Sequence, residues 1–128
     1  MKTEKRRKGD IGEDITCKYL ENKGYRVVDR NYLKPWGEID VVAEKANILS
    51  FIEVKTVTRE NAVYIYNGVR PEENFHATKL KRLYRAIQTY LMDHKVPDSR
   101  LWQIDLVCVY LNFTTKKAHV ELMENIVL

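Results

Sequence analysis

The chain has 128 residues, of which 45% are hydrophobic and 31% are charged, a balance that excludes a disordered chain and fits one globular domain. Lys and Arg number 22 against 18 Asp and Glu, so the net charge of +4 permits contact with nucleic acid without requiring it. The only two cysteines, Cys17 and Cys108, match no metal-binding or redox spacing. We therefore predict a single domain over residues 1–128.

The first residues are basic, and the sequence predicts that residues 1–8 form a flexible basic tail. No apolar segment follows that would make them a signal peptide. No run approaches the roughly 18 apolar residues that a membrane-spanning helix needs. We expect a cytoplasmic protein without a membrane partner.

Seven elements are predicted in chain order. Apolar residues at spacings of three and four indicate two helices, and alternating or continuous β-branched runs indicate five strands. The expected ranges are helix 10–23, strands 25–32, 37–44 and 48–57, helix 77–94, and strands 102–110 and 118–123. The order α-β-β-β-α-β-β predicts an α/β fold in which helices flank a mixed β-sheet.

The most strand-like stretch, residues 37–55, carries charges where a buried sheet is usually apolar. A two-residue hairpin loop at Ala46-Asn47 places Asp40 directly opposite Glu53. Like charges that face each other across a sheet repel, so one carboxyl takes a proton or a cation lies between them. Lys55 supplies one positive charge on the same face. The stretch therefore predicts a cation site at the rim of the sheet.

A surface ion pair is the competing interpretation of the same charges. The register also places Glu38 opposite Lys55, and the Glu-x-Lys pattern is common on exposed strands. Spacing alone leaves both interpretations open.

The pair formed by Asp40 and the tripeptide Glu53-Val54-Lys55 resembles the active-site motif of the PD-(D/E)xK nuclease superfamily, with Ile39 where the motif name has proline. The whole chain resembles the YraN-like family of predicted nucleases, which is related in fold to archaeal Holliday-junction resolvases. The segments that carry this wider resemblance are Gly9-Asp10-Ile11-Gly12-Glu13, Gly37-Glu38-Ile39-Asp40 and Phe51-Ile52-Glu53-Val54-Lys55.

The resemblance implies a restriction-endonuclease-like sheet and a metal-dependent endonuclease that hydrolyses phosphodiester bonds in DNA, with branched or structured DNA as a candidate substrate. Asp40, Glu53 and the Val54 carbonyl are the expected ligands of Mg²⁺ or Mn²⁺, which prefer hard oxygen donors. Lys55 is the expected catalytic lysine, which either orients or deprotonates the attacking water or stabilises developing charge. In the resembled resolvases an acid on the first helix completes the metal shell, so Glu13 is a further catalytic and metal-binding candidate; the alternative is a solvated first-turn glutamate.

Basic residues cluster in two places, and both clusters are candidates for contacts with phosphate groups. They are Lys5, Arg6, Arg7 and Lys8 in the N-terminal segment, and Lys79, Lys81, Arg82 and Arg85 on the second helix. The alternative is a solvated tail and a solvated helix face. Asp105, on a later strand, either caps a loop or reaches the site. DNA is the expected partner, and a homodimer is expected by analogy with the resolvases.

Two other classes of function compete with the nuclease. One is a nucleic-acid-binding protein with a nuclease fold but without turnover, and the other is an adaptor that uses the edge of its sheet. The opposed acids Asp40 and Glu53, with Lys55, favour the nuclease because a binding module has no need to keep them.

Overall fold

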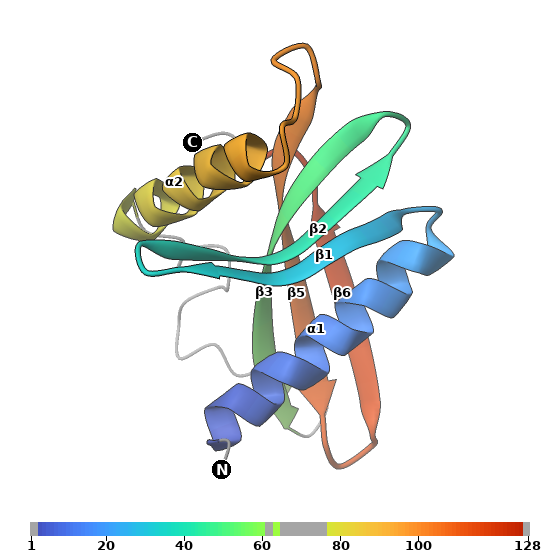
Figure 1. Ribbon diagram of the computed structural model, residues 1–128. Coiled ribbons are helices and arrows are strands. Elements are labelled where there is room, and N and C mark those ends of the chain that lie inside the picture. The colour runs from blue at the N-terminus through green and yellow to red at the C-terminus, as the bar shows by residue number, and fades with distance from the viewer. Residues whose placement is uncertain (1–2, 61–62, 65–76, 127–128) are drawn as a thin grey trace.

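The helices and strands follow the predicted order. The computed structural model describes residues 3–60, 63–64 and 77–126 (Figure 1). Its elements are α1 Glu4–Asn22, β1 Arg26–Lys34, β2 Gly37–Lys45, β3 Ile48–Glu60, β4 Val63–Tyr64, α2 Ala77–Asp93, β5 Trp102–Asn112 and β6 Lys117–Met123. The α-β-β-β-α-β-β order is confirmed, with the two-residue β4 as an addition. In these described ranges neither helix is long and apolar enough to cross a membrane.

The strands form one mixed sheet in the order β1-β2-β3-β5-β6, and β4 pairs with the end of β3. β3 and β5 run parallel, and the other neighbours are antiparallel. The two helices lie on opposite sides of this sheet (Figure 1). The sheet thus has a core on each face, as expected for an α/β fold.

Each helix packs against a different set of strand residues. On the α1 side, Leu20 packs with Ile52 and Val109. On the α2 side, Phe51 packs with Tyr90, whose ring centroid lies 5.5 Å from that of Phe51. Because neighbouring residues of β3 point to opposite cores, this strand is anchored on both faces. It therefore provides a rigid support for whatever follows Ile52 in the chain.

The first helix begins before the point predicted from the sequence. The Thr3 hydroxyl accepts a hydrogen bond from the Arg6 backbone N–H at 3.1 Å, which caps the helix. Arg6 also lies 3.4 Å from Asp10 one turn later. The expected flexible tail is therefore wrong for residues 4–8, which belong to α1.

The hairpin between β2 and β3 has the predicted two-residue turn. Ala46 and Asn47 both have positive φ angles, 51° and 65°, as a tight hairpin turn requires. The predicted register is confirmed where Val42 faces Phe51. The paired ladder, however, ends where Val41 faces Ile52, before it reaches Asp40.

The β1–β2 hairpin bends at the level of Asp40. Pairing between β1 and β2 passes from Arg30–Val41 to Tyr32–Ile39, and Asn31, between them, has a φ angle of 53°. Asparagine tolerates this left-handed conformation better than most residues. The bend also turns Ile39 into the α2-side core, away from the α1-side core that holds Val41. Strict alternation along a strand predicts that Ile39 and Val41 share a face, and the bend makes that prediction wrong here.

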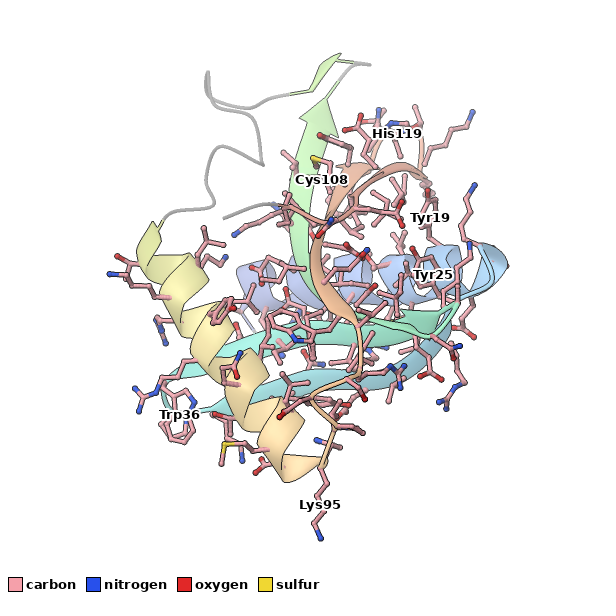
Figure 2. The ribbon with its side chains drawn as sticks, turned by 90° about the horizontal axis from the view of Figure 1, so that it is seen from above. Tyr19, Tyr25, Trp36, Lys95, Cys108 and His119 are labelled. Atoms are coloured by element: carbon pink, nitrogen blue, oxygen red, sulfur yellow. The ribbon has the colours of Figure 1, made fainter. Side chains whose placement is uncertain are left out.

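Beyond the bend, the turn of the hairpin is fixed to α2. The Trp36 indole N–H donates to the Thr89 hydroxyl at 3.1 Å, and the Arg85 guanidinium lies 4.9 Å from the centre of the Trp36 ring. Arg82 Nε donates to the Trp36 carbonyl at 3.3 Å. Trp36 accordingly lies beside α2 in Figure 2. These contacts hold the bent half of the hairpin away from β3.

Gly37 allows this close approach, because a Cβ atom there would lie 2.3 Å from the Arg82 carbonyl oxygen. We expect Gly37→Ala to lower the free energy of unfolding by about 1–3 kcal/mol, since the backbone of α2 cannot yield cheaply. Gly9→Ala is the matched control: its Cβ would meet nothing within 4 Å, and alanine favours the helix. Urea unfolding compares the two variants, and equal stabilities would contradict the close packing of Gly37 against α2.

Candidate functional site

Asp40 lies in the gap that opens between β2 and β3 past the Val41–Ile52 pair, hereafter the fork. Its Oδ2 atom accepts a hydrogen bond from the Val54 backbone N–H at 2.8 Å. In a continued antiparallel ladder, that N–H would bond to the backbone of β2. The carboxylate therefore replaces the backbone acceptor, and the site begins where the sheet separates.

The Val54 carbonyl points into the same fork. In an extended strand, the N–H and C=O of one residue face the same neighbouring strand. Because the Val54 N–H reaches Asp40 on the β2 side, its carbonyl is directed to that side too. The fork thus receives a backbone oxygen beside the carboxylate of Asp40.

Glu53 projects from β3 toward α2. Its side chain is buried, with 6% of the residue exposed. Its Oε1 atom lies 2.7 Å from Lys79 Nζ, at the start of α2, and 3.7 Å from Lys55 Nζ. Together with Asp40, these residues form a cluster of two acids and two lysines at the fork, hereafter the charge cluster.

Burial changes the pKa of two members of the charge cluster. The pKa of Asp40 rises to about 8, first because the carboxyl is buried and second because Glu53 is close, while the bond from Val54 opposes the rise. The pKa of Lys55 falls, first through burial and then through Lys79, and the two acids oppose that fall. The fork therefore disfavours a second negative charge unless a cation compensates it.

Glu13 is buried, as its place at the edge of the apolar face of the first helix suggests, with 5% of the residue exposed. Burial raises its pKa, while Arg6, Asn31 and Arg30 oppose the rise. It belongs to α1, on the other side of β3 from α2, which Glu53 faces. Glu13 Oε1 lies 3.8 Å from the Arg30 guanidinium, outside the hydrogen-bonding range.

The fork provides two of the three acids that were expected to bind a divalent cation, Asp40 and Glu53, and their oxygen atoms suit such an ion. Across the described residues, no three His, Cys, Asp or Glu side chains are grouped closely enough to hold a metal ion. Glu13 thus forms no such group with Asp40 and Glu53, although its charge contributes to the raised pKa of Asp40. Two carboxylates and one backbone carbonyl are hard oxygen donors of the kind that Mg²⁺ and Mn²⁺ accept, and both ions usually keep several waters.

A cleft of about 490 Å³ opens beside the charge cluster, between the β1–β2 turn and α2. Lys34, Lys79 and Arg82 line it together with Glu53. The cleft joins a buried acid to three cationic side chains, an arrangement suited to an anionic polymer that approaches a metal.

The predicted basic residues take different places. Lys79 contacts Glu53, whereas Arg82 and Arg85 contact Trp36 and Lys81 is exposed. At the start of α1, Arg6 and Arg7 are exposed and Lys8 is half-buried, and the side chain of Lys5 lies outside the described part.

Sequence reasoning missed two features of the site. Lys34 lines the cleft, and Asn31 forms the bend opposite Asp40. The Asn31-Tyr32 pair offers a signal for the bend, because asparagine inside a strand pattern indicates an irregular backbone. Lys34 carries no such signal. Asp105 proves to be a cap: its Oδ1 atom accepts from the Asn125 N–H at 2.7 Å.

The comparisons with known proteins agree with the expected family. The profile described as "Uncharacterised protein family UPF0102" matches residues 12–109. A UPF0102 protein of Campylobacter lari is 38% identical over 118 residues, which cover 92% of this chain and 91% of the relative. A UPF0102 protein of Helicobacter hepaticus is 33% identical over 123 residues, 96% of each chain.

The fold and the fork define an α/β protein with a mixed sheet and an acid pair, in which Glu53 is buried and Asp40 is half-buried. The chain belongs to the UPF0102 family, the YraN-like family that its motifs resemble. The matched range includes Glu13, Asp40 and Glu53-Val54-Lys55.

We expect Asp40→Asn to stabilise the metal-free protein as the pH rises. Because the folded pKa of Asp40 is raised, the stability that its neutral carboxyl contributes is complete below about pH 4 and is lost as the pH rises to about 8. Asparagine stays neutral and its carbonyl can still accept from Val54. The variant should gain about 1–2 kcal/mol over wild type at pH 8, and little at pH 4.

Urea unfolding in EDTA at several pH values measures this difference. Glu38→Gln, which alters an exposed acid of the same strand, is the control and should show no such gain. If Asp40→Asn is less stable than wild type at every pH, Asp40 is instead a charged structural acid.

Proposed function

We propose that this protein is a metal-dependent nuclease that hydrolyses phosphodiester bonds in DNA. One observation carries the proposal: the carboxyls of Asp40 and Glu53 are held at a fork in the sheet, and Asp40 is bonded to the Val54 N–H. Opposed acids disfavour each other's charge, so they serve a binding module poorly and a cation site well. The family description names no activity, and the proposal therefore rests on the site.

Asp40, Glu53 and the Val54 carbonyl would hold Mg²⁺ or Mn²⁺. When bound, such an ion supplies positive charge that polarises the phosphate and makes water more acidic. The two carboxylates fix where that charge lies, and burial of Glu53 keeps bulk water from screening it. The hydrogen bond from Val54 keeps the Asp40 carboxylate oriented toward the fork.

Lys55 has two possible roles in the reaction, which differ in its protonation. As an ammonium it donates hydrogen bonds to a phosphate oxygen while negative charge develops. As a neutral amine it accepts a proton from the attacking water, and its lowered pKa favours this form more than an exposed lysine would. The slope of activity against pH separates the roles, because only the second strengthens as Lys55 loses its proton.

Glu13 acts through the backbone in this proposal. Its carboxyl interacts with the Asn31 side chain, and Asn31 forms the bend that opens the fork. Glu13 is therefore a positioning residue.

Nuclease activity should require the acid pair. With Mn²⁺ or Mg²⁺, wild-type protein should cleave at least one of single-stranded, duplex and branched DNA, and EDTA should abolish the cleavage. We expect Asp40→Asn and Glu53→Gln each to lower the rate at least about 100-fold, since each removes a group that organises charge in the transition state. Labelled oligonucleotides resolved on gels measure the rate.

Glu121→Gln is the matched control, because Glu121 is an exposed acid on β6. It should cleave at the wild-type rate. Binding of DNA by wild type with no cleavage of any of these substrates would favour the alternative, a nucleic-acid-binding protein without turnover.

Binding to DNA should weaken with salt, because cationic side chains that contact phosphates release counterions. Lys81 is the cleanest residue to test on α2, since Arg82 and Arg85 also hold Trp36. We expect Lys81→Ala to reduce the slope of log affinity against log salt by about 0.9. Lys117→Ala, on β6, is the control, and an unchanged slope in Lys81→Ala would move the phosphate contacts elsewhere.

A further inference from the structure

Lys79 is the closer of the two lysines to the buried carboxylate of Glu53. Its Nζ atom lies 2.7 Å from Glu53 Oε1, and Lys55 Nζ lies 3.7 Å from the same oxygen. The Lys79 side chain is 40% exposed, compared with 24% for Lys55 and 8% for Glu53. Lys79 therefore extends from the solvent-accessible start of α2 to the buried carboxylate of Glu53.

The position of Lys79 in α2 does not stabilise the helix. It is the third residue of Ala77–Asp93, and a cation in a first turn opposes the helix dipole. The first turn contains no acidic residue that would compensate it. The charge of Lys79 is instead stabilised by its ion pair with Glu53 of β3.

We infer that Lys79 occupies the cation position on Glu53 until a divalent metal ion takes it, and that Lys79 is then released to bind the substrate phosphate. This inference rests on the proposed function, since it assigns a further residue to the same site. In this role Lys79 couples the binding of the metal ion to the binding of DNA. This goes beyond the general phosphate contact expected from its charge.

The charges of the cluster support this exchange. Without a metal ion, Lys79 and Lys55 supply the positive charge beside Glu53, and neither is placed on Asp40. A divalent ion on Asp40 and Glu53 would leave the cluster with excess positive charge, and the metal ion would repel the ammonium group of Lys79. Lys79 is the lysine that can leave, because Lys55 is less exposed and its backbone is held in the centre of the sheet.

The cleft offers Lys79 a place to move. Its four-carbon stem is flexible, and the side chain already lines the cleft together with Lys34 and Arg82. There its ammonium would face a phosphate beside two other cations. Since coupling between two ligands is reciprocal, metal should strengthen binding of DNA and DNA should strengthen binding of metal.

Calorimetric titration of Mn²⁺ into wild type and Lys79→Met tests the first half of this inference. Methionine keeps the apolar stem without the charge. With the competing cation removed, we expect the variant to bind Mn²⁺ about three- to tenfold more tightly, the size of a partly exposed ion pair. Lys79→Arg retains a cation and should bind Mn²⁺ with an affinity near that of wild type.

DNA binding tests the second half. Ca²⁺ binds carboxylates and is used here so that binding can be measured without cleavage. For wild type, Ca²⁺ should strengthen binding to a duplex oligonucleotide. In Lys79→Met this gain in DNA affinity should shrink by about the same three- to tenfold factor as the change in Mn²⁺ affinity. Lys34→Met is the matched control: Lys34 lines the same cleft but lies 3.3 Å from Asp93 Oδ2. It should weaken DNA binding equally with and without Ca²⁺ and leave the Mn²⁺ affinity unchanged.

Circular dichroism first establishes that each variant is folded. If Lys79→Met does not fold, Lys79→Arg provides the test instead. A Mn²⁺ affinity of folded Lys79→Arg that is far from the wild-type affinity would overturn the inference. Equal or weaker Mn²⁺ binding by Lys79→Met would also overturn it, while the proposed nuclease function would stand. Failure of wild type and every variant to bind Mn²⁺ would instead remove the proposed function, and the inference with it.

Discussion

The hydrogen bond from the Val54 N–H to the Asp40 carboxylate is the interaction on which the site depends. A backbone N–H inside a sheet needs an acceptor, and a neighbouring strand normally provides it. Here a side chain provides it, so β2 can leave β3 without exposing an unpaired donor. The same bond orients Asp40 toward the position where Val54 presents its carbonyl. The fork in the sheet and the oxygen donors within it are therefore one structural feature.

Packing on both sides of the fork keeps it open. Phe51 and Ile52 anchor β3 in the two cores just before the acid Glu53. Trp36 fixes the other arm to α2 through Thr89 and the arginines around it. Because both arms are held by buried or bonded groups, the fork keeps its width although the two acids within it repel each other. A strained electrostatic arrangement can thus persist in a small domain, as often occurs at functional sites.

The lysines of the charge cluster come from separate elements, and this difference gives them different freedom. Lys55 is part of the central strand and shares its rigidity. Lys79 stands at the beginning of a helix, beside the cleft. A fixed cation suits a role next to the reacting phosphate, whereas a movable one suits exchange between a carboxylate and a substrate. The same residue type can therefore serve two tasks within one site.

The order of elements, the turn at Ala46-Asn47 and the register through Val42 and Phe51 were predictable from the sequence, because they follow from side-chain alternation and local turn chemistry. So was the candidate pair of Asp40 and Glu53, through the motif. The start of α1 and the face on which Ile39 lies were not predictable from the sequence. The start of α1 depends on the cap that Thr3 provides, and the face of Ile39 depends on a bend that interrupts alternation.

What the sequence alone determined is which residues share a strand and which charges that strand carries. Only the tertiary structure decided that Glu13 forms no metal-binding group with the acid pair, while its charge still acts on Asp40. It also decided that Lys79 joins that pair. The reason is physical. Contacts within a hairpin are set by spacing along the chain, whereas the contact of a helix with the sheet depends on how both cores pack around β3, which no local pattern in α1 or α2 encodes.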